Sequence, residues 1–142
     1  MKKIILTVSI LIGSVAGFFI YQNYEASTGI TITKPIPLEY WDKHQNTPLI
    51  FLISGDAGFS TFTQKLSAQI YNKGYDIYTL NTKKYFWQKK TAEQSAKDFT
   101  DFLESVLKNR KNKQLIIIGY SFGADALPFI VNKMPENIKK QI

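Results

Sequence analysis

The sequence predicts an α/β fold with a mostly parallel sheet and flanking helices, and two kinds of segment support this. Short apolar runs, typical of strands buried on both faces, lie at 48–53 and 115–118. Longer segments between them, 61–74 and 91–113, repeat their apolar side chains at helical spacing. Strands that alternate with helices at these lengths are joined by right-handed crossovers, which place the strands parallel.

The composition is that of an ordinary globular protein. The chain has 142 residues, 44% hydrophobic and 20% charged, which excludes a disordered chain. It has no Cys, which excludes disulfides and thiolate metal sites, and we expect no cofactor and no metal. The net charge of +7 is compatible with a lysine-rich solvated surface or with attraction to an anionic membrane surface. No motif for binding DNA or RNA accompanies this charge, so nucleic acid is not an expected partner.

We interpret residues 1–27 as a signal peptide or an N-terminal membrane anchor. The positive start, Lys2-Lys3, precedes an apolar run over 4–21 whose helical length falls just short of a bilayer's hydrocarbon core. Small residues at 14–16 have the spacing of a cleavage site, but the apolar run continues past them, which favours an uncleaved anchor. Either way the rest of the chain is exported, so we expect a periplasmic protein, free or anchored in the inner membrane.

The next segments predict an edge strand, a connection and the first buried strand. Residues 30–33 alternate apolar and polar side chains, which is typical of an edge strand, and 38–46 is expected to be a polar connection. The buried strand at 48–53 is followed by Ser54-Gly55-Asp56-Ala57-Gly58-Phe59. Such a loop can present a backbone N–H to a developing oxyanion, a contribution of roughly 3–4 kcal/mol per donor. A phosphate-binding loop is less favoured because the Gly-Lys-Ser/Thr ending is missing, and a turn without chemistry stays possible.

Two helices with a strand between them come next. Thr61 and Gln64 have the spacing of a capping box, and apolar side chains at 62, 66 and 70 predict one face packed on the sheet. A strand is expected at 76–80. The aromatic segment Tyr85-Phe86-Trp87 either lines a substrate pocket or packs its loop onto the body, and packing is favoured. A second capping box at 91–94 begins a helix whose end carries the cations of 110–113, where the helix dipole favours them.

The strand at 115–118 leads directly into Gly119-Tyr120-Ser121-Phe122-Gly123. Gly-x-Ser-x-Gly between a strand and a helix is the nucleophile elbow of α/β-hydrolases. Gly119 and Gly123 allow the strained backbone at Ser121 to bend without a Cβ clash. Ser121 is therefore the candidate catalytic nucleophile, and an inert serine at a glycine-rich helix entry is the alternative.

The oxyanion donors follow from the same motif. In an attack of Ser121 on an acyl carbonyl, the backbone N–H of Phe122 and a donor near Asp56 or Ala57 would hold the oxyanion.

The acid and base of the triad are not evident in the sequence. In α/β-hydrolases the base follows the nucleophile, but no His follows Ser121, and the acids after it are Asp125 and Glu136. The chain's single histidine, His44, precedes the nucleophile, and a surface role is favoured for it. We therefore expect residues 28–142 to be a partial α/β-hydrolase-like domain that stops after the elbow helix. It could be a truncated product, a fragment completed by a second chain or a non-catalytic remnant.

Three motifs resemble those of the bacterial VirJ/AcvB virulence proteins. They are the loop at 54–59, the segment from Tyr85 to Gln94, and Gly119-Tyr120-Ser121-Phe122-Gly123-Ala124-Asp125-Ala126-Leu127-Pro128-Phe129. The resemblance runs from about Leu38 to the C-terminus. Ala57, Phe59 and Ala92 depart from it, since they stand where that family usually has Gly, Trp and often Pro.

That resemblance implies an exported, periplasm-facing serine hydrolase. Its implied substrate is an acyl ester such as an aminoacylated phospholipid, and its implied partners are type IV secretion proteins. A different class of function also fits the sequence: a non-catalytic, membrane-anchored interaction module on the same scaffold. A serine without its base is a poor nucleophile, which favours this second hypothesis for the chain as it stands.

Overall fold

The computed structural model describes residues 36–42 and 46–142. These residues fall in the second of the two compact units into which the chain divides, Thr33–Ile142. The expected targeting segment, the expected strand at 30–33 and His44 lie outside the described residues. Within the described ranges, no helix combines the length and the apolar character that crossing a membrane requires.

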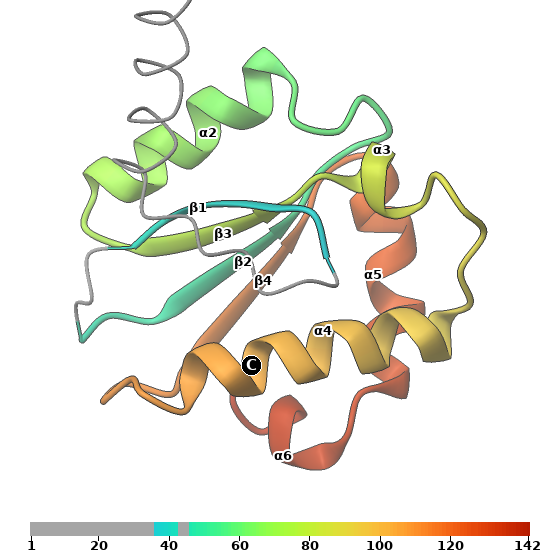
Figure 1. Cartoon of the computed structure of the whole chain (residues 1–142). Coiled ribbons are helices and arrows are strands. Elements are labelled where there is room, and N and C mark those ends of the chain that lie inside the picture. The colour runs from blue at the N-terminus through green and yellow to red at the C-terminus, as the bar shows by residue number, and fades with distance from the viewer. Residues whose placement is uncertain (1–35, 43–45) are drawn as a thin grey trace, which may run out of the picture. The chain divides into compact units, whose positions relative to one another are not determined.

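Four strands form one mixed, mostly parallel sheet in the order β1-β3-β2-β4 (Figure 1). Their bounds are β1 Leu38–Trp41, β2 Leu49–Ile53, β3 Asp76–Leu80 and β4 Leu115–Gly119. The central strand β2 pairs in parallel with β3 on one side and with β4 on the other, whereas β1 runs antiparallel along β3. The predicted α/β class is confirmed.

Strand β1 occupies a segment that was predicted to be a polar connection, so that prediction is wrong. Leu38 is buried, and the ring of Tyr40 stacks on that of Tyr78 with 4.9 Å between centroids. Tyr40 and Tyr78 are directly opposed in the register of β1 on β3. Cross-strand aromatic pairs of this kind stabilise a sheet. The sequence around Tyr40 does not show that Tyr78 is its partner.

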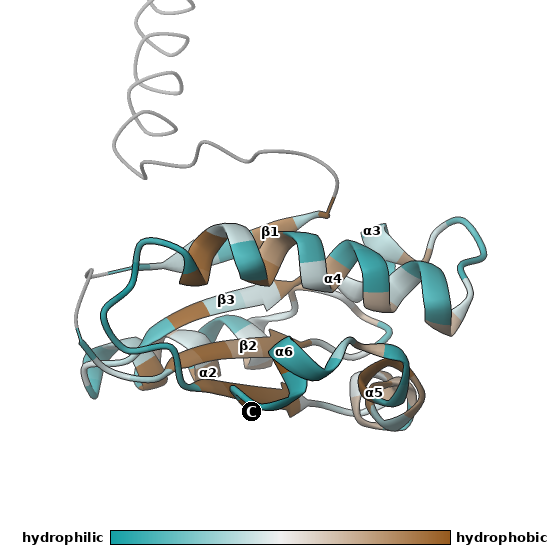
Figure 2. Ribbon diagram, turned by 90° about the horizontal axis from the view of Figure 1, so that it is seen from below, coloured by the Kyte–Doolittle hydropathy of each residue, from teal (hydrophilic) through white to brown (hydrophobic). Residues whose placement is uncertain are grey.

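Helices cover both faces of the sheet (Figures 1 and 2). Helix α2, Thr61–Asn72, packs on one face, where its Leu66 and Ile70 meet Ile50, Leu52 and Ile77. The other face is covered by α4, Ala92–Leu107, together with α5, Phe122–Lys133, and the short α6, Glu136–Lys139. One further short helix, α3, Thr82–Tyr85, follows β3 directly.

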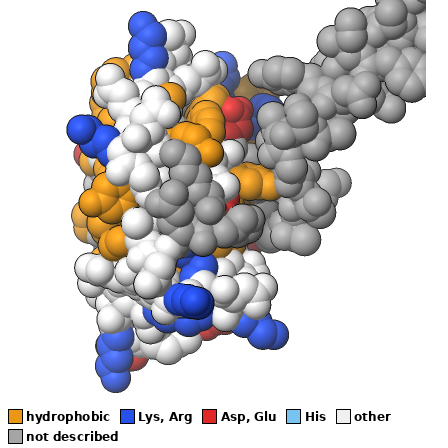
Figure 3. Space-filling model, turned by 90° about the vertical axis from the view of Figure 1, so that its left-hand side faces the viewer, with side chains coloured by type: hydrophobic (Ala, Val, Ile, Leu, Met, Phe, Trp, Pro, Cys, Tyr) orange, Lys and Arg blue, Asp and Glu red, His pale blue; other side chains and the backbone are white. Residues whose placement is uncertain are grey.

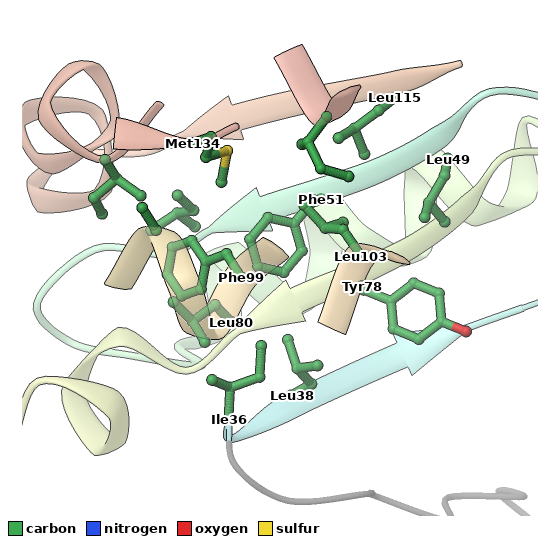
Figure 4. Packing of buried hydrophobic residues seen from close by; sticks show 14 of the residues in the cluster. Ile36, Leu38, Leu49, Phe51, Tyr78, Leu80, Phe99, Leu103, Leu115 and Met134 are labelled. Atoms are coloured by element: carbon green, nitrogen blue, oxygen red, sulfur yellow. The ribbon is translucent and has the colours of Figure 1, made fainter. Parts of the chain in front are cut away.

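The two faces explain why β2 is apolar throughout. All five of its residues are buried, because alternate side chains point to opposite helix layers. Leu49 and Phe51 lie in the cluster under α4 (Figure 4), and the rings of Phe51 and Phe99 meet edge to face at 5.2 Å. Ile50 and Leu52 lie in the cluster under α2.

Helix α4 begins as predicted and α2 does not. The capping box of α4 is present, with Thr91 and Gln94 hydrogen-bonded reciprocally. In α2 the N-cap is Ser60 rather than Thr61, and its side chain accepts a hydrogen bond from the N–H of Thr63. The face of α2 that is most deeply buried carries Thr63 and Ser67, and Phe62 is 51% exposed.

Glu39 in β1 provides a pH-dependent test of stability. Burial raises the pKa of its carboxyl, and the nearby charge of Lys84 only partly offsets this. A carboxyl whose pKa is higher in the folded state binds its proton more tightly there than in the unfolded state. The free energy of unfolding therefore falls as the pH rises from the unfolded-state pKa through the folded-state pKa. We expect Glu39→Gln to give a small rise in melting temperature at pH 7, and this gain should disappear at a pH below the ordinary range of glutamate.

Thermal unfolding followed by circular dichroism at both pH values measures this effect. Glu93→Gln is the matched control, because the ion pair of Glu93 with Lys133 lowers the pKa of the Glu93 carboxyl. The control should not raise the melting temperature at pH 7. A gain from Glu39→Gln that is the same at both pH values would contradict the assignment to ionisation.

Candidate nucleophile site

Three segments that follow parallel strands meet at the carboxyl edge of the sheet. They are the loop 54–60 after β2, helix α3 after β3 and the amino end of α5 after β4 (Figure 1). The carboxyl ends of parallel strands lie at one edge, so the glycine loop and the elbow become neighbours. One hydrogen bond joins the ends of β2 and β4 directly, from Tyr120 N–H to Ile53 O at 3.0 Å.

Ser121 has a strained backbone at the turn between β4 and α5. Its φ of 52° and ψ of −125° make it the one non-glycine residue with positive φ in the described ranges. Such conformations cost about 1–3 kcal/mol and cluster at functional sites. The turn is held by hydrogen bonds from Gly123 N–H to Tyr120 O at 2.9 Å and from Ala124 N–H to Ser121 O at 2.7 Å. The serine is exposed, and its side chain does not cap the helix.

The glycines of the elbow permit close approaches between backbones. A Cβ added to Gly119 would lie 2.6 Å from Ala124 Cα. A Cβ added to Gly123 would lie 2.7 Å from Ser54 O and still closer to Ile53 O. Real Cβ atoms do not come within 3.0 Å of such neighbours. Both positions therefore require glycine.

The glycine loop lies against the candidate nucleophile. A Cβ added to Gly55 would lie 3.2 Å from Ser121 Cβ, which measures how closely the two residues pack. The loop is fixed by its neighbour α3: buried Ser54 accepts a hydrogen bond from Thr82 N–H at 3.1 Å, and Thr82 Oγ1 donates to Ser54 O at 2.7 Å. Gly58 has a φ of 69°, a backbone conformation that glycine adopts without the steric cost that a Cβ imposes on other residues.

The candidate oxyanion donors differ in availability. Phe122 is the first residue of α5, where a backbone N–H has no acceptor within the helix. At the exposed tip of the loop, Ala57 N–H already donates to the side-chain oxygen Oδ1 of Asp56 at 3.0 Å. Asp56 N–H makes no hydrogen bond within the described ranges. Among the described residues, the N–H groups of Phe122 and Asp56 are thus left without an acceptor, whereas that of Ala57 already has one.

The two acids that follow Ser121 in the sequence both lie on helices. Asp125 is exposed in the first turn of α5, where its N–H donates to Ser121 O at 3.2 Å. Glu136 begins α6, beyond the far end of α5 from Ser121. The described residues also contain no group of three or more His, Cys, Asp or Glu that could hold a metal ion.

Two aromatic contacts at the elbow were not predicted from the sequence. The ring of Phe62 lies 4.6 Å from that of Tyr120, and the ring of Phe86 lies 5.4 Å from that of Phe122. The spacing of Phe62 had placed it on the sheet, although its first-turn position beside a loop could have indicated a site role. Phe62, Tyr120 and Phe122 are each more than a third exposed.

The segment Tyr85-Phe86-Trp87 divides between core and surface. Tyr85 is only 3% exposed and its hydroxyl donates to Asp98 at 2.8 Å; burial above all raises the pKa of this phenol, which stays protonated. Phe86 packs partly against the core. The favoured interpretation as packing is confirmed for these two residues and wrong for Trp87, which is 79% exposed.

These features define an α/β protein with a strained, exposed serine between a parallel strand and a helix. A family model described as "Bacterial virulence protein (VirJ)" matches residues 47–142, and the chain belongs to this family. The resemblance noted in the motifs is thereby confirmed. No curated protein and no solved structure gives a significant match.

Proposed function

We propose that this chain carries the nucleophile half of an exported serine hydrolase that acts on an acyl ester. One observation carries the proposal: Ser121 is exposed in a strained backbone conformation while the glycine loop packs against it through Gly55. Backbone strain of this size persists only where the surrounding structure enforces it. Such strained residues cluster at active sites.

The chemistry follows the ordinary path of acyl transfer. Ser121 Oγ attacks the carbonyl carbon and its proton passes to a general base, for which the described residues offer no histidine. The oxyanion that forms accepts hydrogen bonds from the backbone N–H groups of Phe122 and Asp56. Collapse expels the alcohol, which takes the proton, and water then releases the acyl group from Ser121.

The substrate class and location are part of the same proposal. An aminoacylated phospholipid is the favoured ester, supported by the resemblance of the motifs. The positive start, the apolar run at 4–21 and the net charge of +7 support an exported protein held at the inner membrane. Proteins of a secretion system are the proposed partners, on the resemblance alone.

Labelling with a fluorophosphonate tests the nucleophile. We expect the full chain to be labelled slowly at Ser121, because an oxyanion hole without its base still provides a rate enhancement of about 10³–10⁴ over water. Ser121→Ala should abolish the label, and added imidazole, as an external base, should accelerate labelling of the unmodified chain. Labelled peptides identified by mass spectrometry provide the measurement.

Ser105→Ala is the matched control, because Ser105 is also exposed but lies within helix α4 and donates its hydroxyl to Phe102 O. This variant should label as the unmodified chain does. Labelling that persists in Ser121→Ala, or that imidazole leaves unchanged, would overturn the proposal.

A non-catalytic interaction module is the second candidate. It is favoured by apolar side chains left uncovered beyond the site: Phe129 on α5 is 70% exposed, and Ile116 on the edge strand β4 is 37% exposed. A contiguous exposed apolar patch is typical of protein contacts. A chain that resists the fluorophosphonate even with imidazole would favour this function.

A further inference from the structure

The segment Lys83–Lys90 combines cations with one projecting aromatic side chain. It reads Lys83-Lys84-Tyr85-Phe86-Trp87-Gln88-Lys89-Lys90 and contains no acid. Trp87 is the most exposed of the large apolar side chains in the described ranges, at 79%. Lys83, Lys84 and Lys89 are exposed as well. We call Lys83, Lys84, Trp87 and Lys89 the Trp87 rim.

The residues between the rim's members hold it in place. Tyr85 is buried and bonded to Asp98, and Lys90 Nζ lies 3.0 Å from Asp98 Oδ2 and 4.8 Å above the Tyr85 ring. Phe86 packs on Phe122, the residue next to Ser121. Trp87 therefore projects from an anchored segment rather than from a loose one.

The rim lies at the same edge of the sheet as the nucleophile. Helix α3, which carries Lys83 and Lys84, packs on the glycine loop: a Cβ added to Gly58 would lie 3.0 Å from Lys83 Cβ. The same loop packs on Ser121 through Gly55. The rim and the nucleophile thus share the carboxyl edge of the sheet.

Within the described residues, no ion pair neutralises the charges of the rim. Lys90 pairs with Asp98, but in the part of the chain that the structure describes Lys83, Lys84 and Lys89 make no salt bridge. The charge of Lys84 lowers the pKa of the Glu39 carboxyl, but by less than burial raises it. On the side where the strands begin, Figure 3 shows positively charged side chains scattered around small separate groups of hydrophobic atoms.

We propose that the Trp87 rim docks on an anionic lipid bilayer and thereby places Ser121 at the membrane surface. Tryptophan favours the interface between headgroups and acyl chains, and each lysine near an anionic surface contributes about 1 kcal/mol. A second copy of the chain fits less well, because it would bring a like charge of +7 to the same contact. The benefit to a lipid-directed site rests on the proposed function, whereas the docking itself does not.

Tryptophan fluorescence in lipid nanodiscs tests this with the full chain. The protein has two tryptophans, so Trp41→Phe leaves Trp87 as the only reporter. The discs contain either phosphatidylcholine alone or a mixture with phosphatidylglycerol, with bromine on the acyl chains as a quencher. We expect Trp87 emission to shift to the blue and to be strongly quenched in the anionic discs, with much weaker quenching in the neutral discs or at high salt.

Two variants sharpen the result. Trp87→Phe leaves Trp41, which is half-buried and stacked on Phe59 with 5.9 Å between centroids, and its quenching should not depend on the lipid charge. Replacement of Lys83, Lys84 and Lys89 by glutamine, in the Trp41→Phe background, should lower the docking equilibrium about fivefold for each lysine removed.

Three outcomes would overturn the proposal. They are equal quenching in the two kinds of disc, quenching that is unchanged when the lysines are replaced, and a blue shift without bromine quenching. The last would mean that a protein, such as a second copy, covers Trp87. Fluorophosphonate labelling of the same variants in detergent keeps the two proposals apart. Loss of docking with labelling intact contradicts only this inference, and docking without labelling contradicts only the proposed function.

Discussion

Replacing Gly123 with alanine is expected to destabilise the protein by about 3 kcal/mol and to remove the reactivity of Ser121. The new Cβ would lie 2.7 Å from Ser54 O and closer to Ile53 O, both of them backbone atoms. Ile53 O also accepts the hydrogen bond from Tyr120 N–H that joins the ends of β2 and β4. Relief of the clash must therefore separate the elbow from the glycine loop, which moves the nucleophile away from its oxyanion donors.

The sign of the effect distinguishes this account from helix propensity. Gly123 lies in the first turn of α5, and glycine to alanine inside a helix ordinarily stabilises by about 0.5–1 kcal/mol. Urea unfolding and fluorophosphonate labelling of Gly123→Ala measure the two expected losses. Gly55→Ala is the graded control: its nearest neighbour would be the Ser121 side chain at 3.2 Å, so a smaller loss of stability is expected. A stabilised Gly123→Ala would contradict the close packing of the elbow on β2.

The elbow and its sheet could be predicted because their signals are local. The apolar strand, the two glycines and the serine are contiguous in the sequence, and the strain at Ser121 follows from that spacing. The parallel order followed from the alternation of strands and helices. The position of the glycine loop next to Ser121 then needed only the rule that parallel strands end at one edge.

Features that depend on distant partners were missed. Strand β1 forms because β3 offers an edge and Tyr78 offers a ring to Tyr40, residues far away in sequence. Phe62 has helical spacing with Leu66 and Ile70, yet its ring meets Tyr120 at the elbow instead of the sheet. A hydrophobic pattern predicts that a side chain will be buried, but it does not predict which element the side chain packs against.

The cations after α4 illustrate the same limit. They were expected to act on the helix end, and Lys113 does so, since its ammonium donates to the carbonyls of Leu107 and Lys108. Arg110 does not. Its side chain is only 8% exposed and forms an ion pair with the fully buried Asp76 at the start of β3. A pair separated by this much sequence gives no local signal.

Replacing Arg110 with alanine is expected to cost about 3–5 kcal/mol of folding free energy. The guanidinium joins three segments at the amino edge of the sheet: Nη1 pairs with Asp76 and lies 3.9 Å from Asp42 Oδ1, and Nη2 donates to Thr47 O at 2.8 Å. Its removal leaves the buried Asp76 carboxylate without this charge. Breaking one side of a buried pair is costly because the desolvated partner charge stays behind.

That cause can be separated from lost packing by a second substitution. Asp76→Asn in the Arg110→Ala background removes the stranded charge, so the double variant should be more stable than Arg110→Ala alone, although less stable than the unmodified chain. Lys111→Ala, at an exposed neighbouring position, should change the stability by no more than about 0.5 kcal/mol. Urea unfolding at pH 7 measures all three variants. If the double variant is no more stable than Arg110→Ala, the loss arises from packing and from the bond to Thr47, and the ion pair contributes little.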